Sequence, residues 1–182
     1  MDKDSRDTAA REPEARSAAE SVTIPGKIAR FLEQQANVAF AGTRTGELVP
    51  LGHRVSGWSI GADGRTLTAF LPEPFTAGLV ESLQDNGELA ITVEDFPTHE
   101  TYQFKGRYVR HRPLQREDLD IVDRIRERFM KSLRRVYSAV PEATAGAFIA
   151  KPGLAVEFAV FEIYLQTPGP GAGTRLVPPA EA

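Results

Sequence analysis

Thr76 and Gly78 stand at the start of a short predicted helix, where residues of these types can bind an anion. The threonine hydroxyl can cap the helix, and the first backbone N–H groups of a helix have no intrahelical partners. A phosphate group is stabilised at such a position. The same residues suit a purely structural cap, so the pattern leaves a phosphate site and an ordinary helix start as alternatives.

The three histidines, His53, His99 and His111, are further candidates for contact with a ligand. No HExxH motif or other close ligand pair occurs, so no catalytic zinc site is predicted. His99 is expected on an exposed hairpin loop and His111 at an exposed strand end. His53 lies beside Arg54 on a predicted strand and is either a hydrogen-bonded histidine at the rim of a barrel or a contact of a cofactor.

Ser56 and the stretch Gly169–Gly173 lack the sequence context that nucleophilic catalysis and dinucleotide binding, respectively, require. Ser56 has no GxSxG context and no identifiable base, so nucleophilic catalysis is not predicted. The glycines and prolines of Gly169–Gly173 follow the last predicted strand and open no helix, so they form no dinucleotide-binding fingerprint.

The composition limits the class of protein. The chain has 182 residues, a formal net charge of −3 and no cysteine, which argues against a general nucleic-acid binder and excludes disulfides and thiolate chemistry. No apolar run approaches the ~20 residues that cross a bilayer, and no signal peptide is apparent. A cytoplasmic protein without membrane or nucleic-acid partners is expected.

The segment Val49–Ser82 organises the predicted fold. It contains a strand, the turn Gly61–Gly64, a second strand over Thr66–Leu71 with alternating polarity, and the opening of the short helix. The first of these strands changes its apolar face part-way along, and Gly57 stands at the change. A glycine at that place predicts a β-bulge that re-aims the strand.

The remaining elements complete one domain. A helix after Pro25 and the strand Val38–Thr43 precede the central segment, and two strands, the amphipathic helix Arg116–Tyr137 and the strand Ala155–Gln166 follow it. The apolar residues expected on the inner face of the long helix are Leu119, Val122, Ile125, Phe129, Leu133 and Val136. Strands joined mainly by hairpins predict a mainly β fold with flanking helices (α+β), an antiparallel sheet closed into a small barrel. We expect a disordered tail over residues 1–20, a domain over 21–167 and an irregular C-terminal tail over 168–182.

Four stretches resemble the pyridoxamine 5′-phosphate oxidase-like family of FMN-binding split-barrel proteins. They are VAFAGT, GHRVSGWSIGADGRTLTAFLP, PFTAGLVESLQDNGELAITVED and YQFKG, and the resemblance spans roughly residues 24–166. It implies a split β-barrel of the FMN-binding type and a homodimer whose flavin lies in a groove between subunits. We expect Trp58, Phe70 and Phe75 to cover that groove, and for Trp58 packing in the core or at the interface is favoured over stacking on a ring.

The resemblance also implies where the cofactor is bound. The hairpin strand would lie along the flavin ring, and the Thr76 hydroxyl would hold the FMN phosphate. Gln103 and Lys105 would project from the neighbouring strand towards the cofactor. The candidate cofactor-binding residues are His53, Arg54, Val55, Ser56, Gly57, Thr76, Gln103 and Lys105. Family members often carry a lysine or arginine where this chain has Gly78, so weaker FMN binding is expected.

Because a flavin itself performs the electron transfer, an oxidoreductase of this type needs no evident catalytic constellation. We therefore expect an FMN-dependent oxidoreductase acting on a small molecule, with electrons from a reduced nicotinamide or passed to oxygen. Two alternatives stay open: a haem-binding split barrel with a histidine as axial ligand, and a flavin-binding module without turnover.

Overall fold

The computed structural model describes residues 21–72, 76–137 and 151–178, and it confirms the predicted order of elements. The expected tail over residues 1–20 and Phe75 lie outside the described residues. The elements are α1 (Gly26–Gln34), β1 (Val38–Arg44), β2 (Pro50–Arg54), β3 (Gly57–Ile60), β4 (Thr66–Pro72), α2 (Thr76–Asn86), β5 (Glu88–Glu94), β6 (Thr101–Pro113), α3 (Arg116–Val136) and β7 (Pro152–Leu165).

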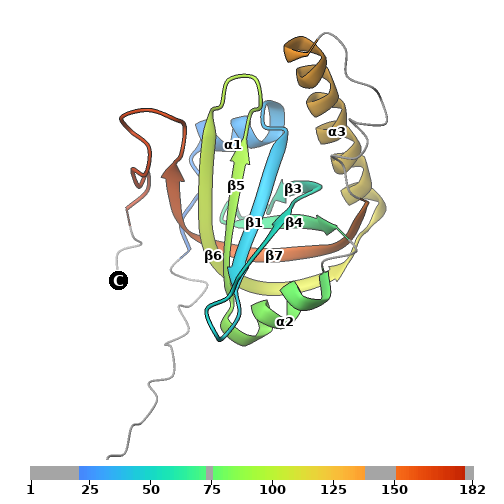
Figure 1. Ribbon diagram of the computed structural model, residues 1–182, viewed down its shortest axis with the longest axis vertical. Helices are drawn as coiled ribbons and strands as arrows, with labels where there is room; N and C mark the ends of the chain where they lie inside the picture. The colour runs from blue at the N-terminus through green and yellow to red at the C-terminus, as the bar shows by residue number, and fades with distance from the viewer. Residues whose placement is uncertain (1–20, 73–75, 138–150, 179–182) are drawn as a thin grey trace, which may run out of the picture.

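The strands form one antiparallel sheet in the order β2-β1-β5-β6-β7-β4-β3 (Figure 1). Its two end strands, β2 and β3, are consecutive in the chain and are separated only by Val55 and Ser56. The Val55 N–H donates to the Ala39 carbonyl on one side, and the Ser56 N–H donates to the Phe70 carbonyl on the other. The sheet therefore closes through this stretch, and the predicted antiparallel barrel is confirmed.

Gly57 follows the point at which the chain changes partner strands. A Cβ atom at this position would lie 3.0 Å from Phe70 Cδ2 and 3.0 Å from Val122 Cγ2. A side chain of any size would push α3 away from the barrel, so the glycine lets the helix pack closely over the β2–β3 junction.

The barrel interior is filled by alternate residues of the strands, as the pattern of β5 predicts. Leu89, Ile91 and Val93 are each at most 3% exposed, and α2 contributes Leu79 and Leu83 to the same core. α2 lies across one end of the barrel (Figure 1).

Trp58 and Phe70 lie in the interior of a single chain, so their expected place at a subunit interface is wrong. Trp58 is 4% exposed and its indole N–H donates to the Leu32 carbonyl at 3.1 Å, while Phe70 is 0% exposed. Of the two kinds of packing expected for Trp58, core or interface, the structure shows the core.

α3 begins at a capping box formed by Gln115 and Asp118, and Arg112 makes a bidentate contact with the Asp118 carboxylate at 2.5 and 3.1 Å. Two residues expected on its inner face, Leu119 and Val136, are 46% and 50% exposed, whereas the residues that α3 buries run from Asp118 to Leu133. Neither α3 nor another helix in the described ranges combines the length and apolarity that crossing a bilayer requires.

Candidate functional site

The outer face of β1, β5 and β6, opposite the core, carries a row of small residues. Strand pairing places Gly52 beside Gly42, Gly42 beside Ala90, and Ala90 beside Lys105. Directly paired residues project from the same face of a sheet, and neighbouring strands lie about 4.8 Å apart. The row of Gly52, Gly42 and Ala90 is therefore a flat surface about 10 Å long, here called the small-residue row.

A pocket of about 640 Å³ lies over Gly42 and Ala90 of this row and is here called the outer pocket. It is lined by Gly42, Thr43, Arg44, Glu88, Leu89, Ala90, Lys105, Gly106, Arg107, Phe161 and Glu162. The volume falls in the range of small-molecule sites, about 300–1,000 Å³. A Cβ atom added to Gly42 would meet only the Leu51 carbonyl oxygen, at 3.9 Å, so the glycine leaves space that a planar ligand could fill.

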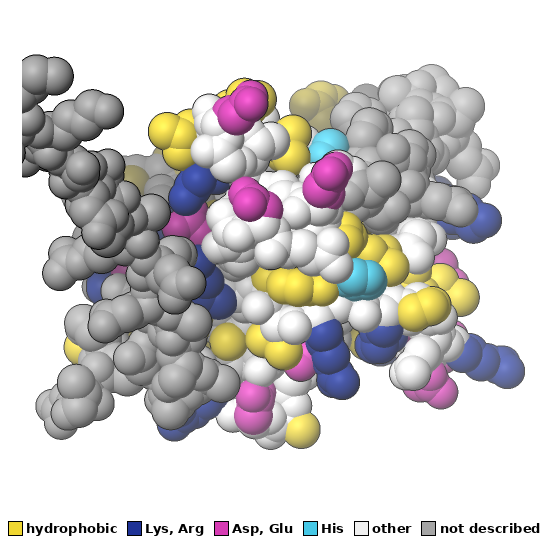
Figure 2. Space-filling model, turned by 90° about the horizontal axis from the view of Figure 1, so that it is seen from below, with side chains coloured by type: hydrophobic (Ala, Val, Ile, Leu, Met, Phe, Trp, Pro, Cys, Tyr) yellow, Lys and Arg dark blue, Asp and Glu magenta, His cyan; other side chains and the backbone are white. Residues whose placement is uncertain are grey.

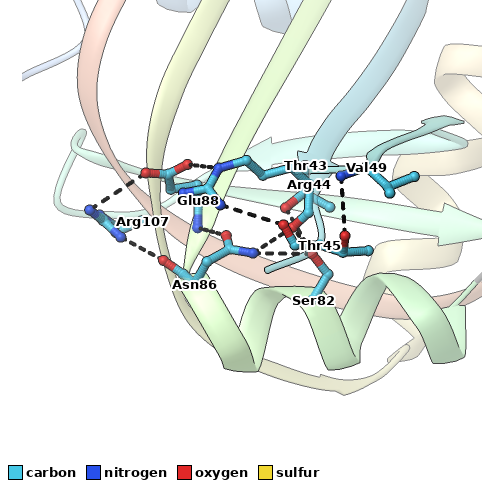
Figure 3. Close-up of polar contacts among 8 residues, drawn as sticks. All are labelled: Thr43, Arg44, Thr45, Val49, Ser82, Asn86, Glu88 and Arg107. Carbon is cyan, nitrogen blue, oxygen red and sulfur yellow. Dashed lines mark hydrogen bonds and ion pairs between the residues drawn. The ribbon is translucent and has the colours of Figure 1, made fainter. Parts of the chain in front are cut away.

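Charged side chains gather at one end of the outer pocket (Figure 3). Arg44 Nε lies 2.9 Å from a Glu88 carboxylate oxygen, and Arg107 Nη2 lies 3.9 Å from the other. Arg107 also donates to the Asn86 carbonyl at 2.6 Å, and the Asn86 and Ser82 side chains both bond the Arg44 carbonyl. The end of α2 thus fixes both arginines; we call Arg44, Glu88, Lys105 and Arg107 the charged end.

An arginine and two aromatic rings lie next to the small-residue row on its other side. Arg54 pairs with Phe40 across β1 and β2, and its guanidinium carbon lies 5.8 Å from the Phe40 ring centroid and 5.2 Å from that of Phe129. Burial lowers the pKa of Arg54. Phe40 remains 52% exposed and offers an aromatic surface beside the row.

A second, polar pocket of about 420 Å³ adjoins the same face. It is lined by Thr92, Glu94, His99, Thr101, Gln103, Gln166 and Pro168. Gln103 donates to the Thr92 hydroxyl at 3.2 Å, and His99 Nδ1 lies 2.7 Å from the Glu94 carboxylate. The His99 side chain is 63% exposed, which confirms the exposed loop position predicted for it.

Three of the predicted cofactor-binding residues share the outer face. Arg54, Gln103 and Lys105 all project from it, although β1 and β5 lie between β2 and β6. Lys105 is exposed, and its ammonium nitrogen lies 4.7 Å from the Tyr164 ring centroid. Of these three, Lys105 lines the outer pocket and Gln103 lines the polar pocket.

The other hairpin candidates lie elsewhere. His53 pairs with Ala41, whose side faces the core, and is half-buried. Val55 is 5% exposed in the core, Ser56 is half-buried at the β2–β3 junction, and Gly57 is buried under α3. The backbone N–H groups of Val55 and Ser56 already bond other strands, so these residues close the barrel.

Thr76 begins α2, as predicted, and α2 is the element that follows β4 in the chain. Gly78, in the first turn, is exposed, and a Cβ atom added there would have no neighbour within 4 Å. The helix carries no basic residue in its sequence TAGLVESLQDN, so any anion bound at its start relies on hydroxyl and N–H groups.

Several residues of the small-residue row and the outer pocket escape prediction from the sequence, chiefly Gly42, Gly52, Arg44, Glu88 and Arg107. No local motif joins them, because they come from β1, β2, β5 and β6 and meet only through strand pairing. The one available signal was the set of glycines inside strands, since an interior glycine often marks close approach of a ligand or of another backbone.

No protein-family model matches the sequence, and no curated protein matches it significantly. Solved structures do match. HupZ from Group A Streptococcus is 14% identical, with 83% of this chain and 100% of that chain covered and a TM-score of 0.50. An FMN-binding protein from Syntrophomonas wolfei is 13% identical, with 75% and 82% covered and a TM-score of 0.45. An F420 reductase is 12% identical, with 77% and 98% covered and a TM-score of 0.45.

At these identities the match to HupZ shows a common fold and nothing finer. That fold agrees with the closed antiparallel sheet and its flanking helices. The chain therefore has the split-barrel fold of pyridoxamine 5′-phosphate oxidase-like proteins, the fold that the sequence resemblance implies.

Proposed function

We propose that this protein binds FMN in the outer pocket and acts as an oxidoreductase on a small organic molecule. The observation that supports this most strongly is that Gly42 and Ala90 of the small-residue row line a pocket of about 640 Å³. A planar ring system can lie flat only where no large side chain rises from the strands, and these two residues provide such a floor, next to Gly52 on β2.

The residues around the floor fit the polar parts of a flavin. Gln103 carries an amide and Lys105 an ammonium group on the outer face, and both can donate hydrogen bonds to ring nitrogen and oxygen atoms. Thr76 and the free N–H groups at the start of α2 would hold the phosphate. FMN would supply the electron transfer, while these residues bind and orient it.

A small-molecule ligand also agrees with the charge distribution. The face seen from below mixes acidic, basic and hydrophobic side chains among the described residues and presents no continuous basic surface there (Figure 2). Together with the net charge of −3, this favours a small ligand over nucleic acid.

The absorbance spectrum of the purified protein with added FMN tests the proposal. We expect the absorbance bands of bound flavin to be shifted relative to those of free FMN. These bands should bleach when a reduced nicotinamide is added. A Soret band in the purified protein would instead identify haem. Bound flavin that no reductant bleaches would identify a flavin-binding module without turnover and contradict the enzymatic part of the proposal.

A further inference from the structure

The charged end of the outer pocket has an excess of positive charge. Arg44, Lys105 and Arg107 face one carboxylate, Glu88, which leaves a local charge of +2 in a chain whose net charge is −3. The other carboxylate of the pocket, Glu162, lies 3.4 Å from Arg175 Nη1 and is compensated by it. Anions are therefore attracted to this end of the pocket.

The basic groups are both held in place and accessible. Glu88 and the Asn86 carbonyl orient the two arginines, whose side chains are 38% (Arg44) and 30% (Arg107) exposed. Lys105 makes no ion pair within the described part of the chain. Pre-oriented guanidinium groups bind phosphate oxygens through paired hydrogen bonds, so the arrangement suits a phosphate better than a neutral group.

This end is distinct from the start of α2, where the FMN phosphate is proposed to bind. The two positions lie at opposite ends of α2, because Asn86 contacts the charged end while Thr76 begins the helix. At 1.5 Å per residue the helix separates them by about 15 Å, which no single phosphate can bridge.

We infer that the charged end binds the phosphate or pyrophosphate group of a second ligand, which lies beside the flavin in the same pocket. The position of this ligand next to a flavin rests on the proposed function. The anion site itself rests only on Arg44, Lys105 and Arg107.

Inorganic pyrophosphate is the probe, titrated into the full chain with and without FMN. Arg107→Gln should weaken pyrophosphate binding about ten-fold, since it removes a charge-assisted contact, and Arg107→Lys should restore only part of the affinity, because an ammonium group keeps the charge but not the paired hydrogen bonds. Glu88→Gln should tighten binding, because it removes the competing carboxylate and still accepts the Arg44 hydrogen bond. Lys27→Gln, an equal change of charge on the exposed face of α1, should leave binding unchanged.

FMN and riboflavin affinities of the same variants identify the source of the phosphate. We expect neither to change with Arg107→Gln or Glu88→Gln. If FMN affinity follows these substitutions and riboflavin affinity does not, the charged end holds the cofactor's own phosphate and the inference of a second ligand is overturned. Absence of pyrophosphate binding, or binding that is the same in all variants, overturns the anion site. If pyrophosphate binds with the expected pattern but no flavin binds, the proposed function fails and the anion site stands.

Discussion

Gly78 is the residue whose substitution should change FMN affinity most directly. It is exposed in the first turn of α2, and a side chain there meets no other atom within 4 Å. Gly78→Lys would add a charge-assisted contact to a phosphate at this helix start, so FMN should bind roughly ten-fold more tightly. Thr76→Ala should weaken FMN through loss of a hydrogen bond and of the cap.

Riboflavin is the control for both substitutions, because it lacks the phosphate. Its affinity should hardly change in either variant. Equal affinities of parent and variants for FMN would show that the phosphate binds elsewhere, or that the natural ligand is not FMN.

Tyr102 should make stability depend on pH in the alkaline range. Burial and a hydrogen bond from its hydroxyl to Glu100 raise the pKa of Tyr102 to about 12. The folded state therefore favours the neutral phenol, so this stabilisation is present below the unfolded pKa of about 10 and is lost as the pH rises towards 12. At about 1.4 kcal/mol per pKa unit, the loss is at most about 2 to 3 kcal/mol.

Urea unfolding from pH 8 to pH 11.5 measures this effect. The parent protein should lose stability over this range faster than Tyr102→Phe, which cannot ionise at this position. Parallel curves for the two proteins would show that the folded state does not protect the phenol.

Among the elements, the pairing of β6 with β7 depends on Gly106, which lies at a shift in their register. A Cβ atom there would lie 2.0 Å from the Ala159 carbonyl oxygen and 2.7 Å from Phe158 Cδ2, neither of which can move without disturbing the sheet. Gly106→Ala should therefore cost at least about 3 kcal/mol of unfolding free energy. Gly42→Ala, in open space on β1, is the matched control and should be neutral within about 0.5 kcal/mol. Comparable unfolding curves for the two variants would refute this account of the pairing between β6 and β7.

The helices and strands were largely predictable from the sequence, because the patterns that specify them extend over only a few residues. Alternation in β5 and the turn Gly61–Gly64 act over a few residues, and Asp63 bonds the Arg65 and Thr66 N–H groups as such a turn requires. The inner face of α3 was less well predicted at Leu119 and Val136. The barrel surface that an amphipathic helix meets decides which of its apolar residues become buried. The helix sequence does not contain that information.

The pocket was less predictable than the elements. Arg54, Gln103 and Lys105 were named through the family resemblance, and the structure places them on one face. The small-residue row and the charged end were not foreseen, since each depends on the register between strands that are distant in the sequence. Register follows from the whole closed sheet, so these residues become a group only once it has formed.

For the whole molecule, we predict a homodimer that uses the outer face. Phe40 is 52% exposed on that face and lies beside Arg54, whereas Trp58 and Phe70 are buried and unavailable. A specific interface should bury more than about 1,000 Å². Sedimentation at micromolar concentration should show a dimer, and Phe40→Asp should shift it towards monomer.

Leu119→Asp, which removes a comparably exposed apolar side chain from α3, is the control and should remain dimeric. A parent protein that sediments as a monomer would contradict both the dimer and a flavin site shared between subunits.

The most direct test of the central claim is FMN titration of the parent, Gly42→Leu and Ala62→Leu proteins, followed by flavin fluorescence. Gly42→Leu adds a side chain at the floor of the outer pocket, where a Cβ atom would have only the Leu51 carbonyl oxygen nearby, at 3.9 Å, while Ala62→Leu adds the same side chain at an exposed turn. The account predicts saturable FMN binding to the parent and to Ala62→Leu, and loss of binding in a folded Gly42→Leu protein. Undiminished FMN binding by Gly42→Leu would contradict a flavin site over the small-residue row.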